Sequence, residues 1–389
     1  MPQKMWALTY DVATDPWDST RGLWKRQVDR PELDEARDPD DATRVIVKLR
    51  YAGFCGSDRG IWARKSFSDM IRDSLAREGK TTRIVGHELL GEVIAMGSRA
   101  GTETTVRVGD TVTTESHQTC GKCFQCRQGD THVCADDKII GISTDGCFAE
   151  YAKLPAKTLW AVNLDKIRPE VAAVQEPFGN TTHCAQQVDL RGKRIAIFGC
   201  GTIGLFLTAI ARAMGAKTII GIEPYEPNAA LARRLGIDHV ISPSTEPGAT
   251  PYAHDETVVR KVRELTDGVG VDVAFELAGP NASVNNAIAV ARRGGHVIFF
   301  GLKSGDFTIE RFDRVIMNGL QFHGVVGRRI FETWEITRRL LESREPNVHD
   351  QVWNMILNGG DGTLIDFATF DREQFEKSLH DHTKLVLKF

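Results

Sequence analysis

The sequence predicts an α/β fold in which a doubly wound parallel sheet is inserted into a split, β-rich domain. From about residue 193 onward, short apolar strands alternate with amphipathic helices, as in a parallel sheet with helices on both faces. Before that point strand patterns and turns dominate, and the tail of short amphipathic elements that closes with a strand at 384–389 is too small to form its own domain. We therefore expect residues 189–322 to form the inserted domain, with 1–188 and 323–389 forming the domain around it.

The parallel sheet is organised around residues 194–223, RIAIFGCGTIGLFLTAIARAMGAKTIIGIE. A buried strand, Arg194–Phe198, leads into a G-x-G-x-x-G pattern that continues as a helix through Thr202 and Ile203. The three glycines of this pattern are Gly199, Gly201 and Gly204. They allow a tight turn, close approach to a pyrophosphate at the helix N-terminus, and close packing of the helix on the strand. A second strand ends at Glu223, which is placed to bind an adenosine ribose. A glycine-rich turn alone would not explain this order, which indicates a Rossmann dinucleotide-binding unit.

Four cysteines in the segment 115–136 have the spacing C-x2-C-x2-C-x7-C; they are Cys120, Cys123, Cys126 and Cys134. Four thiolates in one short loop suit a closed, structural zinc site. An iron–sulfur cluster is the alternative, but the fourth cysteine is too distant for the bacterial ferredoxin pattern and no proline follows it. Disulfides fit a reducing compartment less well.

A second, dispersed set of candidate ligands consists of Cys55, His87, Glu88 and Glu176. Three protein ligands of mixed sulfur, nitrogen and oxygen type, together with a water, would make a catalytic zinc site. Taken singly, each residue has an ordinary interpretation, as a core thiol, a turn histidine or a surface glutamate. The remaining cysteines, Cys147, Cys184 and Cys200, are interpreted as small buried residues.

The motifs occur together in an order that resembles the zinc-dependent medium-chain dehydrogenases of the alcohol dehydrogenase superfamily. Cys-Gly-Ser-Asp at 55–58 comes first, then Gly-His-Glu at 86–88, the cysteine lobe and the nucleotide unit. Four further stretches resemble the threonine dehydrogenases, with sorbitol and glucose dehydrogenases as neighbours: 119–123, 146–151, 176–180 and 327–334. This resemblance implies a GroES-like β-rich domain and a homo-tetramer or homo-dimer.

The resemblance also implies roles for single residues. Cys55 and His87 would bind a catalytic zinc, with Glu88 or Glu176 completing the shell. Ser57 would accept the proton of the alcohol. NAD would lie on the glycine unit and near the ends of two later strands, at Gly301 and Val326. In the family a histidine usually ends the proton relay, at a position where this chain has Gly60.

The implied reaction transfers hydride from a secondary alcohol, a threonine-like amino alcohol or a polyol, to NAD and gives a ketone. The alternatives are a sugar or cyclitol dehydrogenase acting on a ring hydroxyl, and a non-catalytic nucleotide-binding relative. The segment Ser66–Glu78 has a helical apolar pattern. It predicts a surface helix that covers the core, and the alternative is a flap that shapes the substrate pocket.

Composition narrows the possible partners. A net charge of −3 gives no reason to expect nucleic acid or an anionic membrane surface. No apolar run is long enough to span a bilayer, and the first ten residues lack the apolar core of a signal peptide. Eight cysteines are too few for a disulfide scaffold in 389 residues. A cytoplasmic enzyme with a small-molecule substrate is the expectation.

Overall fold

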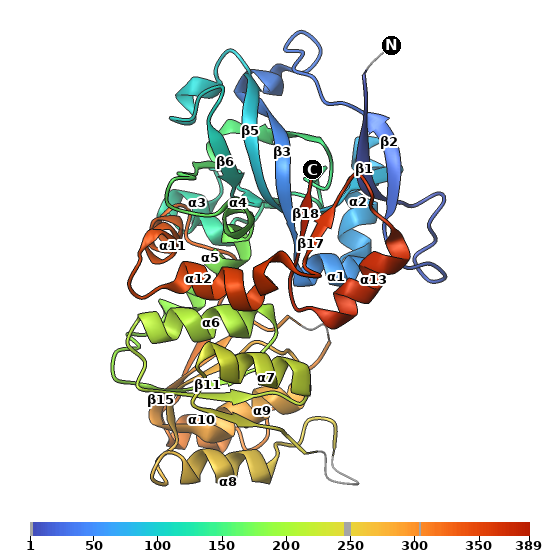
Figure 1. Ribbon diagram of the computed structural model, residues 1–389. Helices are drawn as coiled ribbons and strands as arrows, with labels where there is room; N and C mark the ends of the chain where they lie inside the picture. Colours follow the sequence, from blue (N-terminus) through green and yellow to red (C-terminus); the bar gives the residue numbers. More distant parts are fainter. Residues whose placement is uncertain (1–2, 245–249, 303–304) are drawn as a thin grey trace. The chain divides into compact units, whose positions relative to one another are not determined.

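The computed structural model describes residues 3–244, 250–302 and 305–389, and the chain divides into two compact units (Figure 1). We call Met1–Pro177 with Leu357–Phe389 the β-rich unit, and Phe178–Ile356 the parallel-sheet unit. The predicted α/β fold class, with a parallel-sheet unit inserted into a β-rich one, is confirmed. None of the described helices is long and apolar enough to cross a membrane.

The parallel-sheet unit contains a six-stranded sheet in the order β13-β12-β11-β14-β15-β16. Its strands are β11 (Arg194–Phe198), β12 (Thr218–Ile222), β13 (His239–Ile241), β14 (Val271–Glu276), β15 (Ala291–Phe299) and β16 (Gln321–Gly324). Every described pairing in this sheet is parallel. Both faces of such a sheet are covered, which explains why β11 and β12 are apolar along most of their length.

Helices cover the two faces of this sheet. The unit's helices are α6 (Thr202–Ala213), α7 (Glu226–Leu235), α8 (Glu256–Glu264), α9 (Asn281–Val290), α10 (Asp313–Met317), α11 (Glu332–Glu342) and α12 (Val348–Gln351), of which α6, α7 and α9 contact the strands directly. Helix α6 packs with α7, and α8 packs with α9, on opposite sides of the strands (Figure 1). The alternating pattern predicted from residue 193 onward is therefore confirmed.

The β-rich unit is built on a sheet in the order β10-β6-β5-β3-β18-β17, with β9 also paired to β3. Its strands are β3 (Arg44–Phe54), β5 (Glu88–Met96), β6 (Thr111–Thr114), β9 (Tyr151–Pro155), β10 (Leu159–Ala161), β17 (Leu364–Asp366) and β18 (Leu385–Lys388). Smaller sheets join β1 (Lys4–Asp11) to β2 (Trp24–Asp29) and β4 (Thr82–Ile84), and β7 (His117–Gln118) to β8 (Lys138–Ile139). The C-terminal strand β18 pairs antiparallel with β3, so the last segment of the chain completes the sheet that the first segment forms.

The helices of the β-rich unit are short. They are α1 (Gly56–Trp62), α2 (Ser68–Glu78), α3 (Phe124–Gln128), α4 (Pro169–Ala172) and α13 (Arg372–Asp381), and α5 (Gln175–Ala185) begins at the end of the unit's first segment. In α2, Ile71 and Leu75 are buried in the main core, so the predicted surface helix over the core is confirmed. The helix begins at Ser68 because Phe67 has a left-handed backbone, with φ of 70°, which a helix cannot include.

The compact units divide after residues 177 and 356, whereas the sequence pattern placed the boundaries after 188 and 322. Residues 323–356 belong to the parallel-sheet unit because α11 packs with α12, and α12 packs on α6. Only 357–389 return to the β-rich unit. An amphipathic helix pattern shows that one face is buried, but it does not show against which unit.

Candidate metal centres and nucleotide site

Cys55 and Ser57 owe their positions to the start of helix α1. Cys55 is the N-cap of this helix, with an extended backbone, and directly follows strand β3. The Asp58 carboxylate accepts a hydrogen bond from the Cys55 N–H at 2.9 Å, which satisfies a donor at the helix N-terminus. Ser57 Oγ lies 3.0 Å from His87 Nε2. A thiol, a hydroxyl and an imidazole thus meet at one end of α1.

Glu88 is the first residue of strand β5, and His87 directly precedes it. A Cβ atom at Gly53 would lie 1.9 Å from Glu88 Oε2, so β3 must carry glycine at this point. His87 Nδ1 lies 3.5 Å from Asp58 Oδ1. Ligand atoms of Cys55, His87 and Glu88 all lie within 4.8 Å of one another. These three residues, which lie far apart in the sequence, form a metal-sized cluster of mixed ligands.

The two candidate carboxylate ligands, Glu88 inside this cluster and Glu176 outside it, have different partners. Both oxygens of Glu88 contact the ammonium of Lys384, at 2.6 and 2.5 Å, and both side chains are fully buried. Glu176, buried at the start of α5, accepts a hydrogen bond from Ser116 Oγ at 2.7 Å. Glu176 lies outside the 4.8 Å group, but its charge raises the pKa values of Asp58 and Glu88.

The charges of the cluster suit a bound cation. Burial raises the pKa of the Asp58 carboxyl, and burial also raises that of Glu88 against the opposing effect of Lys384. Burial alone would lower the pKa of His87, but Asp58 and Cys55 raise it well above its usual value. His87 Nδ1 is buried and makes no hydrogen bond within the described structure. This donor set fits zinc, which accepts sulfur, nitrogen and oxygen ligands together and offsets buried negative charge.

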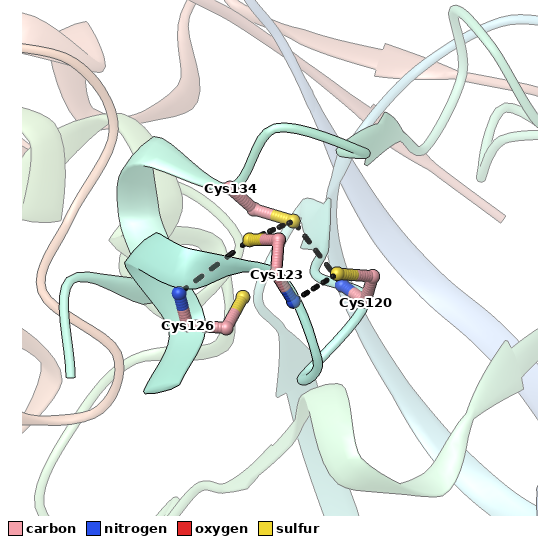
Figure 2. Close-up of side chains that lie close together, drawn as sticks. All are labelled: Cys120, Cys123, Cys126 and Cys134. Atoms are coloured by element: carbon pink, nitrogen blue, oxygen red, sulfur yellow. Dashed lines mark hydrogen bonds between the residues drawn. The ribbon is translucent and has the colours of Figure 1, made fainter. Parts of the chain in front are cut away.

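The four cysteines of the predicted lobe come together in one loop (Figure 2). Their sulfur atoms lie within 4.8 Å of one another, and Cys123 Sγ and Cys134 Sγ are 3.9 Å apart. A tetrahedral site with Zn–S bonds of about 2.3 Å has sulfur atoms about 3.8 Å apart. Backbone N–H groups donate to Cys120 Sγ and Cys123 Sγ. The N–H groups of Cys126 and Ala135 have the largest effect on Cys123 and lower its pKa to about 6. All eight cysteines are free thiols, and this loop fits a closed zinc site.

The glycines of the G-x-G-x-x-G turn have three separate geometries. Gly199 has a φ of 92°, which glycine adopts without strain. Gly201 caps α6 and faces open space, where a ligand can approach the backbone. A Cβ at Gly204 would lie 2.0 Å from the Gly199 carbonyl oxygen, so glycine permits the close packing of helix on strand. Thr202 and Ile203 form the first turn of α6, next to this open face.

Glu223 follows β12 and its carboxylate is held by the backbone. Its two oxygens accept hydrogen bonds from the N–H groups of Cys200, at 2.7 Å, and Tyr225, at 2.8 Å. Gly301 and Val326 follow β15 and β16, at the same edge of the sheet. A Cβ at Gly301 would lie 2.5 Å from the Gly279 amide nitrogen, whereas Val326 is exposed. The carboxyl edge of a doubly wound sheet is where nucleotides bind.

A cavity of about 750 Å³ opens beside Gly199 and Glu223 in the parallel-sheet unit. Its lining includes three acidic residues, Glu223, Asp255 and Glu256. None of the described lining residues is a lysine or an arginine. His254 forms part of the wall, with its ring between Glu310, at 2.6 Å, and Glu256, at 2.9 Å. The cavity is large enough for an adenosine, and the charged side chains of its described lining are acidic apart from His254.

Comparison with known proteins identifies the family. Residues 202–343 match the family described as zinc-binding dehydrogenase, and residues 41–164 match the alcohol dehydrogenase GroES-like domain. An L-threonine 3-dehydrogenase of Pyrococcus horikoshii is 37% identical over 304 residues, which cover 78% of this chain and 81% of that protein. The L-threonine 3-dehydrogenase of Bacillus subtilis is 33% identical over 365 residues, 92% of each chain. The chain belongs to the zinc-binding alcohol dehydrogenases.

The fold of these alcohol dehydrogenases extends over the whole chain. The crystal structure of 2R,3R-butanediol dehydrogenase from Bacillus subtilis superimposes with a TM-score of 0.79 at 21% identity and covers 99% of both chains. The protein is therefore a zinc-containing oxidoreductase acting on CH–OH groups, with a GroES-like domain and a Rossmann sheet.

Some residues at the alcohol dehydrogenase site were not predicted from the sequence. Lys384 pairs with Glu88 across 296 positions of sequence, and no local pattern connects them. Ser116 binds Glu176, again without a sequence signal. Asp58 had a signal, since an acidic residue three positions after an N-cap is typical of a helix start.

Proposed function

We propose that the protein oxidises a secondary alcohol that carries a neighbouring amino or hydroxyl group, giving a ketone, with NAD as the hydride acceptor. The meeting of Cys55 and His87 at the start of α1, with Ser57 against His87, is the observation that carries this proposal. The threonine dehydrogenases among its relatives support an amino alcohol as the first substrate to test.

The chain's own residues would divide the work at the metal. Zinc, when bound, supplies Lewis acidity that lowers the pKa of an alcohol, and NAD supplies the hydride acceptor. Cys55 and His87 would hold the ion, and Asp58 would orient the His87 ring from its other side. We assign the third ligand to Glu176, because Lys384 already contacts both oxygens of Glu88.

Ser57 would take the proton that the alcohol loses. Its hydroxyl is 3.0 Å from His87 Nε2, beside the proposed ligands, and a hydroxyl can accept one proton while it releases another. The helix cap formed by Asp58 fixes the position of Ser57 in α1. Removal of a positioned proton acceptor usually costs on the order of a hundredfold or more in rate.

The acidic cavity supports NAD rather than NADP. Glu223 is held in place by two backbone donors, and its ionised carboxylate would lie beside the ribose 2′ position. A 2′-phosphate there would meet the carboxylates of Glu223, Asp255 and Glu256 without a lysine or arginine among the described lining residues. The resulting repulsion would lower the affinity for NADP.

The test is a spectrophotometric screen of amino alcohols, polyols and aldoses with NAD and NADP, combined with zinc analysis. We expect two zinc ions per chain, reduction of NAD by an amino alcohol such as threonine, and at least tenfold lower kcat/KM with NADP. Cys55→Ser should abolish turnover but preserve thermal stability and NAD binding. Equal efficiency with the two cofactors, or exclusive oxidation of aldoses, would contradict the proposal.

A further inference from the structure

Helix α1 ends in a specific backbone motif that folds the next residues over the helix. The N–H of Lys65 donates to the Gly60 carbonyl at 2.8 Å, and the N–H of Arg64 donates to Ile61 at 3.1 Å. Arg64 has a φ of 57°. These are the two hydrogen bonds and the left-handed residue of a Schellman cap. The cap reverses the chain directly after α1.

The Arg64 side chain stabilises this reversal. Its guanidinium donates to the carbonyls of Ile61, at 2.7 Å, and Gly22, at 2.8 Å, and lies over the ring of Tyr10 at 4.7 Å. An arginine in a left-handed conformation is uncommon, so these contacts hold a backbone that its local preference disfavours. Ser66, two residues later, is therefore held against the helix.

Ser66 occupies the space that a side chain at Gly60 would need. A Cβ at Gly60 would lie 2.9 Å from Ser66 Oγ and 3.0 Å from Ser66 Cβ, closer than nearly all real Cβ contacts. Gly60 is one helical turn after Ser57, and residues three apart lie on the same face of a helix, with about 5–6 Å between their Cβ positions. The Ser66 hydroxyl thus lies on the side of α1 that carries Ser57.

The Ser66 hydroxyl has free hydrogen-bonding capacity. It makes no hydrogen bond to any other residue in the described part of the chain, and Ser66 is only partly buried. A hydroxyl can donate one hydrogen bond and accept two, so Ser66 can contact water or a ligand hydroxyl on one side and solvent on the other.

We propose that Ser66 carries the proton between Ser57 and solvent, from the position that a side chain at residue 60 would otherwise fill. This inference rests on the proposed alcohol oxidation. The substrate's O–H proton passes to Ser57 Oγ as the proton of Ser57 leaves, and that proton reaches Ser66 through a hydrogen-bonded chain. Ser66 accepts it and releases its own proton to water, so neither serine changes its charge or composition. Ser66 acts through Ser57 and is a positioning residue.

The steric premise is tested first, without any enzymatic assay. Gly60→Ala should lower the melting temperature of the protein by several degrees, because its methyl group collides with Ser66. In a Ser66→Gly background the same change should cost little or nothing. Equal losses in the two backgrounds would show that Ser66 does not fill this space, and the inference would fail.

The relay is tested by Ser66→Ala, which removes only the hydroxyl. We expect roughly a tenfold or greater loss in kcat and in the rate of proton release to a pH indicator, with unchanged zinc content and NAD affinity. Imidazole buffer should partly restore the rate. The matched control is Ser68→Ala, since Ser68 bonds Arg72 at the start of α2 and should leave turnover unchanged.

The double variant Gly60→His/Ser66→Gly places a histidine at residue 60 and removes the Ser66 side chain, which makes room for the imidazole ring. It should recover most of the activity lost in Ser66→Ala, with a new fall in rate below about pH 6.5, where imidazole becomes protonated. Turnover and proton release at the parent rates in Ser66→Ala, or equal losses in Ser66→Ala and Ser68→Ala, would overturn the inference. A parent protein that oxidises no alcohol would instead refute the proposed function.

Discussion

At the scale of single residues, the most consequential contact of the metal cluster is the buried ion pair between Glu88 and Lys384. Both side chains are fully buried, and the ammonium also donates to the Phe54 carbonyl at 3.2 Å. Separating such a pair leaves an uncompensated charge in a medium of low polarity. The pair joins Lys384, directly before β18, to β5 at the position where the cluster forms, so Glu88 stabilises the fold through an ion pair.

The different partners of Glu88 and Glu176 predict that two conservative substitutions will affect different properties, stability in one variant and zinc retention in the other. Glu88→Gln should lower the free energy of unfolding by about 3–5 kcal/mol, because the Lys384 ammonium loses its carboxylate. Glu176→Gln should leave stability almost unchanged, since an amide oxygen can still accept from Ser116, but it should weaken zinc retention on the order of tenfold or more. Denaturant unfolding and competition with a chelator measure the two effects. Tighter zinc retention in Glu176→Gln than in Glu88→Gln would assign the third ligand to Glu88.

The residues predicted best from the sequence are those whose roles depend on local geometry. Gly199 and Gly204 have the turn and packing geometries that the G-x-G-x-x-G pattern indicates, because φ and contacts within one turn follow from neighbouring residues. The cysteine lobe is local for the same reason. Lys384 and Ser116 could not be predicted, because their partners lie in distant strands and helices that only the folded sheet brings together.

At the scale of elements, buried strands and amphipathic helices were predicted well, and segments with a polar sequence less well. The acidic, proline-containing stretch 29–41 has the composition of a solvated loop. Its last residue, Asp41, is buried in a 3-10 helix (Pro39–Thr43) that leads into β3. Its carboxylate contacts Lys153 of β9 at 2.7 Å and accepts the Asp34 N–H at 2.9 Å. A carboxylate with such partners joins the loop to the sheet.

The Asp41 carboxylate makes stability depend on pH. Burial raises its pKa, but the contacts with Lys153 and the Asp34 N–H outweigh burial and hold its pKa below the usual value. The pKa of Asp41 is lower in the folded protein than in the unfolded chain, where it is about 3.9. The ionised carboxylate therefore contributes its full stabilisation above about pH 3.9, and this stabilisation is lost as the pH falls through the folded pKa.

Asp41→Asn should therefore destabilise the protein by roughly 1–3 kcal/mol at pH 7 and by progressively less below about pH 4. Denaturant unfolding of both proteins across this range measures the difference. Asp40→Asn is the matched control, because Asp40 is the adjacent carboxylate and is exposed. A difference between the parent and Asp41→Asn that stays constant down to pH 3 would assign the effect to shape rather than charge.

At the scale of the whole molecule, the parallel-sheet unit has an open edge. Strand β16 is the last in its sheet and pairs only with β15 among the described strands. Side chains beside it are apolar and exposed, including Ile316 at 70% and Met317 at 71%. An open strand edge next to exposed apolar side chains is a typical site of association. It gives a physical basis to the homo-oligomer that the resemblance implies.

We expect two copies of the chain to associate along β16, with the strands antiparallel about a two-fold axis, because an isologous contact pairs the same edge with itself. The parent protein should then have at least twice the monomer mass in light scattering. The double variant Ile316→Asp/Met317→Asp should sediment as a smaller species while keeping its zinc, since α10 belongs to the parallel-sheet unit and the residues proposed to hold metal belong to the β-rich unit. Val108→Asp is the matched control, because Val108 is 60% exposed but belongs to the β-rich unit. A monomeric parent, or equal dissociation in the control, would place the association elsewhere or exclude it.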